Sequence, residues 1–149
     1  MSQSLEQLLE ENEYVQISPE GYSMYPILCP GRDQVILKKL GGERIRRGQV
    51  LLYRRESGRL VLHRVWRVRK DGIYMVGDNQ SETEGPLPRE AFLARAVAFV
   101  RKGRQFSEKN LVYVVLTRIW LFLRPLRMPI MKPLAALKRW LRGFRKPRP

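Results

Sequence analysis

Cysteine and histidine are nearly absent from this sequence, since Cys29 and His63 are the only residues of their types. A lone cysteine cannot form an internal disulfide, and one cysteine with one histidine provides no cluster for a zinc ion. The sequence therefore predicts neither a disulfide framework nor a metal site, and it gives no indication of a cofactor.

A long apolar run is also missing. The longest nearly continuous apolar stretch is residues 111–123, with the sequence LVYVVLTRIWLFL. As a helix it would span about 20 Å, whereas the hydrocarbon core of a bilayer is about 30 Å thick. The acidic start, MSQSLEQLLEENEY, has neither a basic nor an apolar region, so we expect no cleavable signal peptide. We expect a protein that is attached peripherally to a membrane or is cytoplasmic.

Positive charge is what the sequence has in excess. The 149 residues carry a net charge of +15, and 44% of them are hydrophobic, which suits one globular domain with an anionic partner. Residues 101–149 contain 14 basic residues and one acidic residue, whereas residues 1–20 contain five glutamates and no basic residue. We divide the chain into a short acidic segment at 1–13, a β domain at 14–102 and a basic, apolar-rich helical tail at 103–149.

The first two of these parts have clear local patterns. Ser4 precedes LEQLLEE and can cap a short helix. Six stretches rich in β-branched and aromatic residues then alternate with glycine-containing turns, which predicts a mainly β fold with a compact antiparallel sheet. The expected strands are YVQIS (14–18), DQVILKKL (33–40), QVLLYRR (49–55), RLVLHRVWRVR (59–69), GIYMVG (72–77) and ARAVAFVRK (94–102).

The tail has a helical pattern beyond residue 130. Its apolar residues recur at spacings of four and three, and basic residues occupy other positions of the helical wheel. Such a helix suits an anionic membrane surface, which would contact residues 111–145. Packing of the apolar segments on the sheet is an equal alternative, and nucleic acid is a weaker one because no base-stacking aromatic motif accompanies the charge. The apolar positions are Ile130, Leu134, Leu137, Leu141 and Phe144.

Three polar residues of the β domain could carry chemistry. Ser23 lies in GYSMYP, a constrained loop in which a serine most often belongs to a turn. Strand alternation places His63 on an apolar face with Val61 and Val65, where a histidine is most often a hydrogen-bonded core residue. Asp78 lies in the turn GDN, where aspartate usually bonds the backbone. None of the three indicates catalysis by itself, because a serine hydroxyl needs a neighbouring base.

The order of the motifs changes this interpretation. The succession GYSMYPIL, PGRDQV, RRGQVLLYRR, LVLHRV and VGDN resembles the signal peptidase I and LexA-like superfamily of serine peptidases, over about residues 21–79 and more loosely to 101. The resemblance implies a LexA/signal-peptidase-like sheet domain. It also implies that Ser23 is the nucleophile, that His63 is the general base and that Asp78 orients the imidazole. The implied substrate is a protein or peptide precursor bound as an extended strand.

The sequence departs from the family pattern near each of these residues. Most bacterial members have a lysine base, and His63 instead resembles the base of the endoplasmic-reticulum-type signal peptidases. Gly21 stands where lysine-type enzymes often place an oxyanion-hole hydroxyl, so backbone N–H groups, including that of the serine, would stabilise the oxyanion. Glu82 or Glu84 is the alternative to Asp78 as the orienting acid, and Cys29 is a rival nucleophile.

The leading hypothesis is therefore a signal-peptidase-like serine endopeptidase with a Ser-His dyad. The alternative is a non-catalytic peptide-binding or regulatory module on the same fold, held at a membrane surface by the basic tail. In the family a transmembrane helix usually precedes the serine, whereas here 22 mostly polar residues precede Ser23. We therefore expect any membrane attachment to come from the C-terminal segments.

Overall fold

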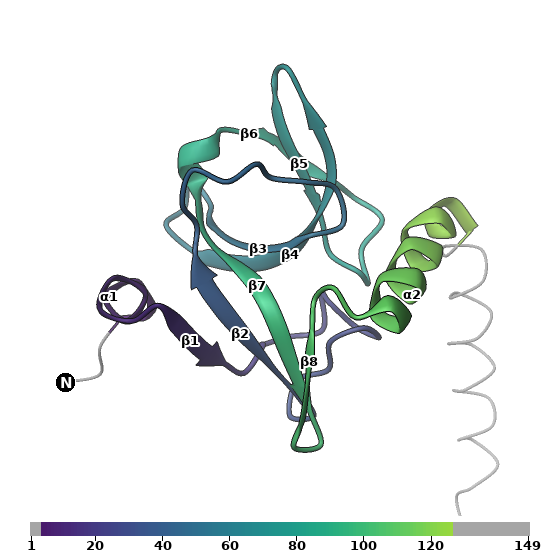
Figure 1. The fold of residues 1–149 in the computed structure, drawn as a ribbon. Coiled ribbons are helices and arrows are strands. Elements are labelled where there is room, and N and C mark those ends of the chain that lie inside the picture. Colours follow the sequence, from purple (N-terminus) through teal and green to yellow (C-terminus); the bar gives the residue numbers. More distant parts are fainter. Residues whose placement is uncertain (1–3, 127–149) are drawn as a thin grey trace, which may run out of the picture.

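The structure is a computed structural model that describes residues 4–126. Within this range eight strands form one antiparallel sheet, with one short helix before the first strand and another after the last, which confirms the mainly β fold expected from the sequence (Figure 1). The elements are α1 (Leu5–Glu11), β1 (Tyr14–Ile17), β2 (Asp33–Lys39), β3 (Val50–Arg54), β4 (Leu60–Arg69), β5 (Gly72–Val76), β6 (Glu84–Leu87), the 3-10 turn η1 (Arg89–Ala91), β7 (Phe92–Arg101), β8 (Arg104–Ser107) and α2 (Leu111–Phe122).

Helix α1 begins at the expected cap. The Ser4 hydroxyl accepts a hydrogen bond from the N–H of Gln7 at 3.2 Å, and the Gln7 side chain accepts one from the N–H of Ser4 at 3.0 Å. This reciprocal capping box satisfies two N–H groups at the start of the helix. Leu9 is buried in the core, so the apolar side of this short helix covers one end of the sheet.

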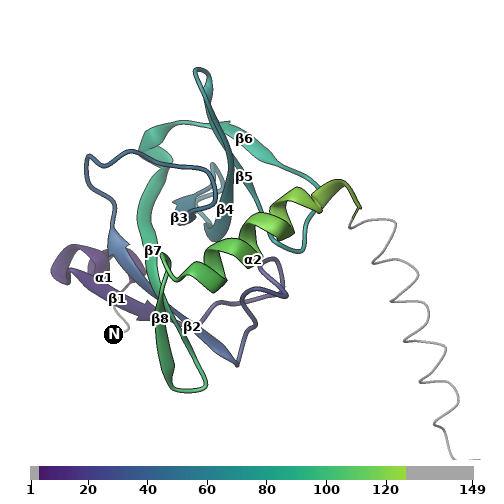
Figure 2. The same ribbon diagram turned by 45° about the vertical axis from the view of Figure 1, so that its right-hand side comes forward.

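The sheet is strongly curved, and β7 runs through its centre. The strand order is β1-β2-β7-β3-β4-β5-β6, and β8 pairs with the far end of β7. The register shifts between Ile36 and Leu37 where β2 pairs with β7, and again between Leu52 and Tyr53 where β3 pairs with β7. Irregularities of this kind bend and twist a strand pair, and Figures 1 and 2 show β3 to β7 curling round on themselves. Two apolar clusters fill the interior.

Two strands were not predicted from the sequence. β6 has the sequence EGPL, but it is the last strand of the sheet order, and an edge position tolerates a proline that cannot donate a hydrogen bond. β8 extends the sheet beyond residue 102, into the segment expected to be a helical tail. A tight turn through Lys102 and Gly103, both with positive φ, returns the chain antiparallel to β7.

Helix α2 confirms the helix expected from residue 111. Its N-cap is Asn110, whose side chain accepts a hydrogen bond from the N–H of Tyr113 at 3.2 Å. The helix has 12 residues, and no helix within residues 4–126 is long and apolar enough to cross a membrane. The amphipathic helix expected at 130–144 lies outside the described residues.

Candidate active site

Ser23 lies in the loop between β1 and β2, and this loop is fixed to the body of the domain. Met24 and Leu28 bury their side chains in the first apolar cluster. The carbonyl of Ser23 accepts a hydrogen bond from the N–H of Asn79 at 2.8 Å. The N–H of Ser23 donates to no group in the described part of the chain. The loop therefore holds Ser23 through its neighbours and its carbonyl.

The turn GDN approaches the serine so closely that its first residue must be small. A Cβ atom placed on Gly77 would lie 2.7 Å from the carbonyl oxygen of Ser23 and 2.6 Å from the side-chain oxygen of Gln80. These distances are too short for any side chain at this position. The glycine of VGDN thus serves the packing of the turn against the serine loop.

Asp33, the aspartate of GRD, holds the far end of the same loop. Its carboxylate accepts hydrogen bonds from the N–H of Cys29 at 2.9 Å and from the guanidinium groups of Arg32 and Arg101 at 2.7 and 2.8 Å. Arg101 also donates to the carbonyl of Ile27 at 2.6 Å. Burial would raise the pKa of Asp33, but the hydrogen bonds from the two arginines outweigh it and lower the pKa to about 2. Asp33 therefore stays ionised and anchors the loop at neutral pH.

His63 lies within β4 and is 1% exposed. Its Nδ1 atom is 3.0 Å from the hydroxyl of Tyr53, which donates a hydrogen bond to Oε2 of Glu84 at 2.8 Å. The other carboxylate oxygen, Oε1, lies 3.5 Å from Nδ1 of His63. Arg55 binds both oxygens of Glu84, one of them through Nε at 2.8 Å. A chain of polar side chains thus runs from the imidazole through a tyrosine to an arginine-paired carboxylate.

The sheet register explains this convergence. In the pairing of β3 with β4, Leu51 is opposite His63 and Tyr53 is opposite Val61, so Tyr53 and His63 lie diagonally on the same face. On the next strands Val65 pairs with Met75, which in turn pairs with Glu84 at the start of β6. The pairings of β4 with β5 and of β5 with β6 therefore bring Glu84 to the same face of the sheet as His63.

The surroundings of His63 and the charges of Glu84 and Arg55 determine the protonation state of its imidazole. Burial lowers the pKa of His63 to about 4, with Glu84 opposing the shift and Arg55 adding to it. Burial would raise the pKa of Glu84, but hydrogen bonds from Arg55 and Tyr53 outweigh it and lower the pKa below its usual value. Burial and the bond to Glu84 raise the pKa of Tyr53. At neutral pH the imidazole is therefore neutral, the carboxylate is ionised and the phenol keeps its proton.

This pattern assigns the tautomer of His63. Because the Tyr53 proton is donated to Glu84, the tyrosine oxygen is the acceptor toward Nδ1, which must then carry the imidazole hydrogen. The lone pair of the neutral ring is left on Nε2. A histidine in this state can accept a proton from a hydroxyl group, as a general base does.

Asp78, the preferred orienting acid from the sequence, has a different main partner. Its two carboxylate oxygens accept hydrogen bonds from Arg64 at 2.8 and 2.7 Å, and both side chains are 0% exposed. The carboxylate that the structure places beside Nδ1 of His63 belongs to Glu84, the alternative considered above, whereas Glu82 is exposed. The geometry therefore favours Glu84 over Asp78 for orienting the imidazole.

Ser23 and His63 line the same cavity, which has a volume of about 280 Å³. Within the described residues no hydrogen bond joins the Ser23 hydroxyl to the imidazole. Catalytic hydrogen bonds are often long in the free enzyme and shorten when substrate binds. Cys29, the rival nucleophile, does not line this cavity. The lining residues are Pro19, Glu20, Gly21, Tyr22, Ser23, Met24, Arg55, Arg59, Leu60, Val61, Leu62, His63 and Gln80.

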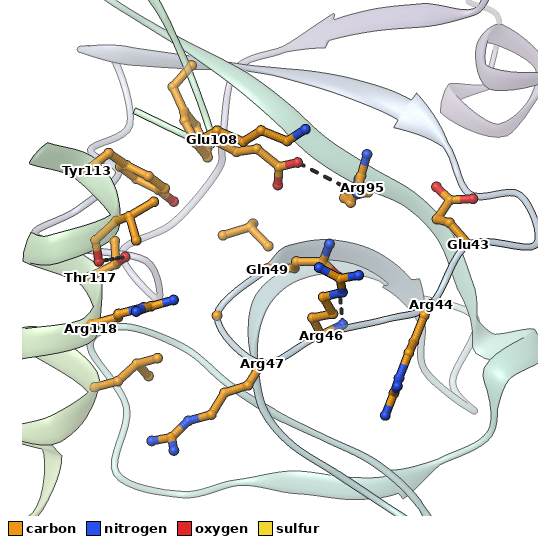
Figure 3. A pocket seen from close by; sticks show the side chains of 16 residues that line it. Glu43, Arg44, Arg46, Arg47, Gln49, Arg95, Glu108, Tyr113, Thr117 and Arg118 are labelled. Carbon is orange, nitrogen blue, oxygen red and sulfur yellow. Dashed lines mark hydrogen bonds and ion pairs between the residues drawn. The ribbon is translucent and has the colours of Figure 1, made fainter. Parts of the chain in front are cut away.

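A second cavity of about 510 Å³ lies between α2, β7 and the loop before β3, and it contains neither Ser23 nor His63 (Figure 3). Arginine side chains from three elements surround it, and Glu108 pairs with Arg95 at its upper side. No group of three His, Cys, Asp or Glu side chains within residues 4–126 could hold a metal ion. The labelled lining residues are Glu43, Arg44, Arg46, Arg47, Gln49, Arg95, Glu108, Tyr113, Thr117 and Arg118.

Comparisons with known proteins identify no relative: no family model, no curated protein and no solved structure matches this chain. The resemblance to the signal peptidase I and LexA-like superfamily therefore depends on the ordered motifs, and the chemistry proposed below depends on the geometry of the site.

Proposed function

We propose that this chain is a serine endopeptidase that hydrolyses a peptide bond in a precursor protein or peptide. The observation that carries the proposal is the shared cavity of Ser23 and His63, which come from a loop and from a strand distant in the sequence. A buried, neutral imidazole with its Nδ1 hydrogen held by Tyr53 is suited to act as a base on Ser23.

The reaction follows from these positions. His63 Nε2 removes the proton of Ser23 as the hydroxyl oxygen attacks the scissile carbonyl carbon, and the free N–H of Ser23 stabilises the resulting oxyanion. His63 then gives its proton to the departing amine, which leaves an ester on the serine. Water attacks this ester with His63 again acting as the base, and the proton returns to Ser23 as the acid product leaves.

Tyr53 and Glu84 are positioning residues in this scheme. While His63 is protonated, the negative charge of Glu84 stabilises the positive charge of the imidazole ring, both through the Tyr53 hydroxyl and directly at 3.5 Å from Nδ1. This replaces the direct histidine–carboxylate hydrogen bond of a Ser-His-Asp triad with a bond through a phenol.

The size of the cavity favours small side chains next to the scissile bond. Its volume of about 280 Å³ lies just below the range of about 300–1,000 Å³ that is common for small-molecule pockets. A peptide could place one short side chain in it and continue along the surface in an extended conformation.

The test is cleavage of a mixed peptide library and of precursor proteins by the purified chain, with products identified by mass spectrometry. Ser23→Ala should abolish cleavage, and Ser18→Ala, the same change at an exposed serine of the same loop, should leave it intact. Cleavage that persists in Ser23→Ala, or a folded protein that cleaves nothing, would overturn the proposal. The second outcome would favour a non-catalytic peptide-binding module.

A further inference from the structure

Helix α2 has two different faces, and one of them is bound to the domain. Thr117 and Leu121 are buried, and Tyr113 packs its ring against Phe99 with ring centres 4.7 Å apart. Trp120 donates a hydrogen bond from Nε1 to the carbonyl of Asp78 at 2.8 Å. These contacts hold the helix against the sheet and the GDN turn, so its orientation on the domain is fixed.

The opposite face is apolar and exposed. A helix turns about 100° per residue, so positions spaced by three or four gather on one side. Six large apolar side chains lie on this side, and each is between 45% and 79% exposed. Figure 2 shows α2 on the outside of the domain, where no labelled strand lies over it. The six residues, called the outer face of α2 below, are Leu111, Val112, Val115, Leu116, Ile119 and Phe122.

Basic residues border the outer face. The described residues from 109 to 126 include Lys109, Arg118 and Arg124 and no acidic residue. Arg118 lies at the border of the outer face and reaches toward the cavity that Arg46 and Arg47 also line (Figure 3). None of these three arginines forms a salt bridge with a carboxylate of the described chain. Glu108 lines the same cavity and is paired with Arg95. The helix therefore presents an apolar surface bordered by arginines that have no carboxylate partner in the described chain.

We infer that the outer face of α2 docks this protein on a membrane that contains anionic phospholipid. An interfacial helix buries its apolar side at the boundary of headgroups and acyl chains, while the flanking arginines and lysines meet the phosphates. The 12 residues of α2 are about 18 Å long, which is too short to cross a bilayer and sufficient to lie in its plane.

The charge also favours an anionic bilayer over two other occupants of the outer face, a second copy of the chain and residues 127–149 of the same chain. A second copy of the chain would carry another net charge of +15, and the two copies would repel each other. The sequence of residues 127–149 has eight basic residues and no acidic residue, so it carries no charge that complements the arginines around α2. An anionic bilayer complements both the apolar face and its surroundings.

The position of α2 has a consequence that rests on the proposed function. The helix contacts the GDN turn through Trp120 and the following loop through Arg124, which donates to the carbonyl of Ser81. Gln80, between these contacts, lines the cavity of Ser23 and His63. Docking would place this cavity close to the membrane surface, which favours substrates with a cleavage site near the bilayer.

The test measures binding of the full chain to vesicles by flotation, and it requires no peptidase activity. We expect binding to phosphatidylcholine vesicles that contain phosphatidylglycerol and much weaker binding to pure phosphatidylcholine. Leu116→Gln combined with Ile119→Gln should lower the affinity for the anionic vesicles at least about tenfold, because two apolar side chains lose their burial. The matched control is Tyr14→Gln with Val68→Gln, two exposed apolar residues elsewhere, and it should bind as the parent does.

The occupant is identified with an environment-sensitive dye on Leu116→Cys in a Cys29→Ser background. A blue shift of the dye emission that appears only with anionic vesicles supports docking. A dye already blue-shifted in the vesicle-free monomer shows that the chain covers its own helix, and a shift that follows protein concentration shows a second copy. Either result, or equal vesicle binding by the double glutamine variant and its parent, overturns the inference. Circular dichroism confirms that each variant is folded.

Discussion

Removal of the negative charge of Asp78 separates a structural role of this residue from a role at the histidine. Asp78→Asn replaces one carboxylate oxygen with an NH₂ group and leaves Arg64 charged in a site where both side chains are 0% exposed. Arg64 also donates to the carbonyl of Gly48 at 2.8 Å and to the hydroxyl of Tyr113 at 3.2 Å. The guanidinium therefore cannot turn to water without breaking the contacts that join α2 to the sheet.

The expected loss of stability follows from this burial. Breaking a buried ion pair by removing one partner costs about 3–5 kcal/mol, because the other charge is left without compensation. Each kcal/mol shifts the Tm of a chain of about 150 residues by about 2–4 °C. We therefore expect Asp78→Asn to lower the Tm by at least about 6 °C. Arg64→Met combined with Asp78→Leu should recover most of this loss, since an apolar pair leaves no charge unpaired.

Urea unfolding followed by tryptophan fluorescence measures the effect, with Asp71→Asn as the matched control. Asp71 is exposed and accepts a hydrogen bond from Tyr74 at the surface, so its change should cost less than about 1 kcal/mol. If Asp78→Asn were as stable as this control and had lost peptidase activity, the assignment of Asp78 to the structural pair would be refuted. Asp78 would then act on His63.

Four further predictions concern the site itself. Tyr53→Phe removes the hydroxyl between His63 and Glu84. In steady-state assays kcat should fall at least about tenfold, but by less than the 10²–10⁴-fold that a general base supplies, and KM should not change. An unchanged kcat would contradict the role of Tyr53 in positioning the imidazole. Because burial lowers the pKa of His63 to about 4 in the folded state, from an ordinary value of 6.5, kcat/KM should stay constant down to pH 5 and fall near pH 4. The same shift means that, as pH falls, His63 is protonated in the unfolded chain before it is protonated in the folded chain. The contribution of His63 to stability is therefore complete above pH 6.5 and is lost as pH falls toward 4. Urea unfolding at several pH values measures this loss. Gly77→Ala places a methyl group 2.7 Å from the carbonyl of Ser23, so it should cost about 1–3 kcal/mol of stability and reduce cleavage; a variant as stable and active as the parent would show that this contact is absent.

The main features of the fold could be predicted because the strands carry strong local signals. The stretches QVLLYRR and RLVLHRVWRVR contain β3 and β4 almost to the residue, and the cap at Ser4 marks the start of α1. β6 was missed because EGPL has the composition of a turn, and its strand conformation depends on pairing with β5 at the edge. Local propensity does not contain that information.

The candidate site could be predicted only in part for the same reason. Ser23 and His63 were found through the order of short motifs, and strand alternation placed His63 on the correct face. Glu84 was predicted only as one of two alternatives to Asp78, and Tyr53 was not recognised as a partner of the imidazole, because their proximity depends on the register of three strand pairs and on a strand that was not predicted. Arginine is rarely buried, so no local pattern indicated that Arg64 pairs with Asp78.

Labelling of Ser23 by a fluorophosphonate is the most direct test of the Ser-His dyad. The purified protein is treated with the reagent, and the adduct is located by peptide mapping with mass spectrometry. We predict one adduct, on Ser23, that forms at least about 100-fold more slowly in His63→Gln, because the serine then has no base. A folded protein that forms no adduct on Ser23, or a labelling rate that His63→Gln leaves unchanged, would contradict this prediction.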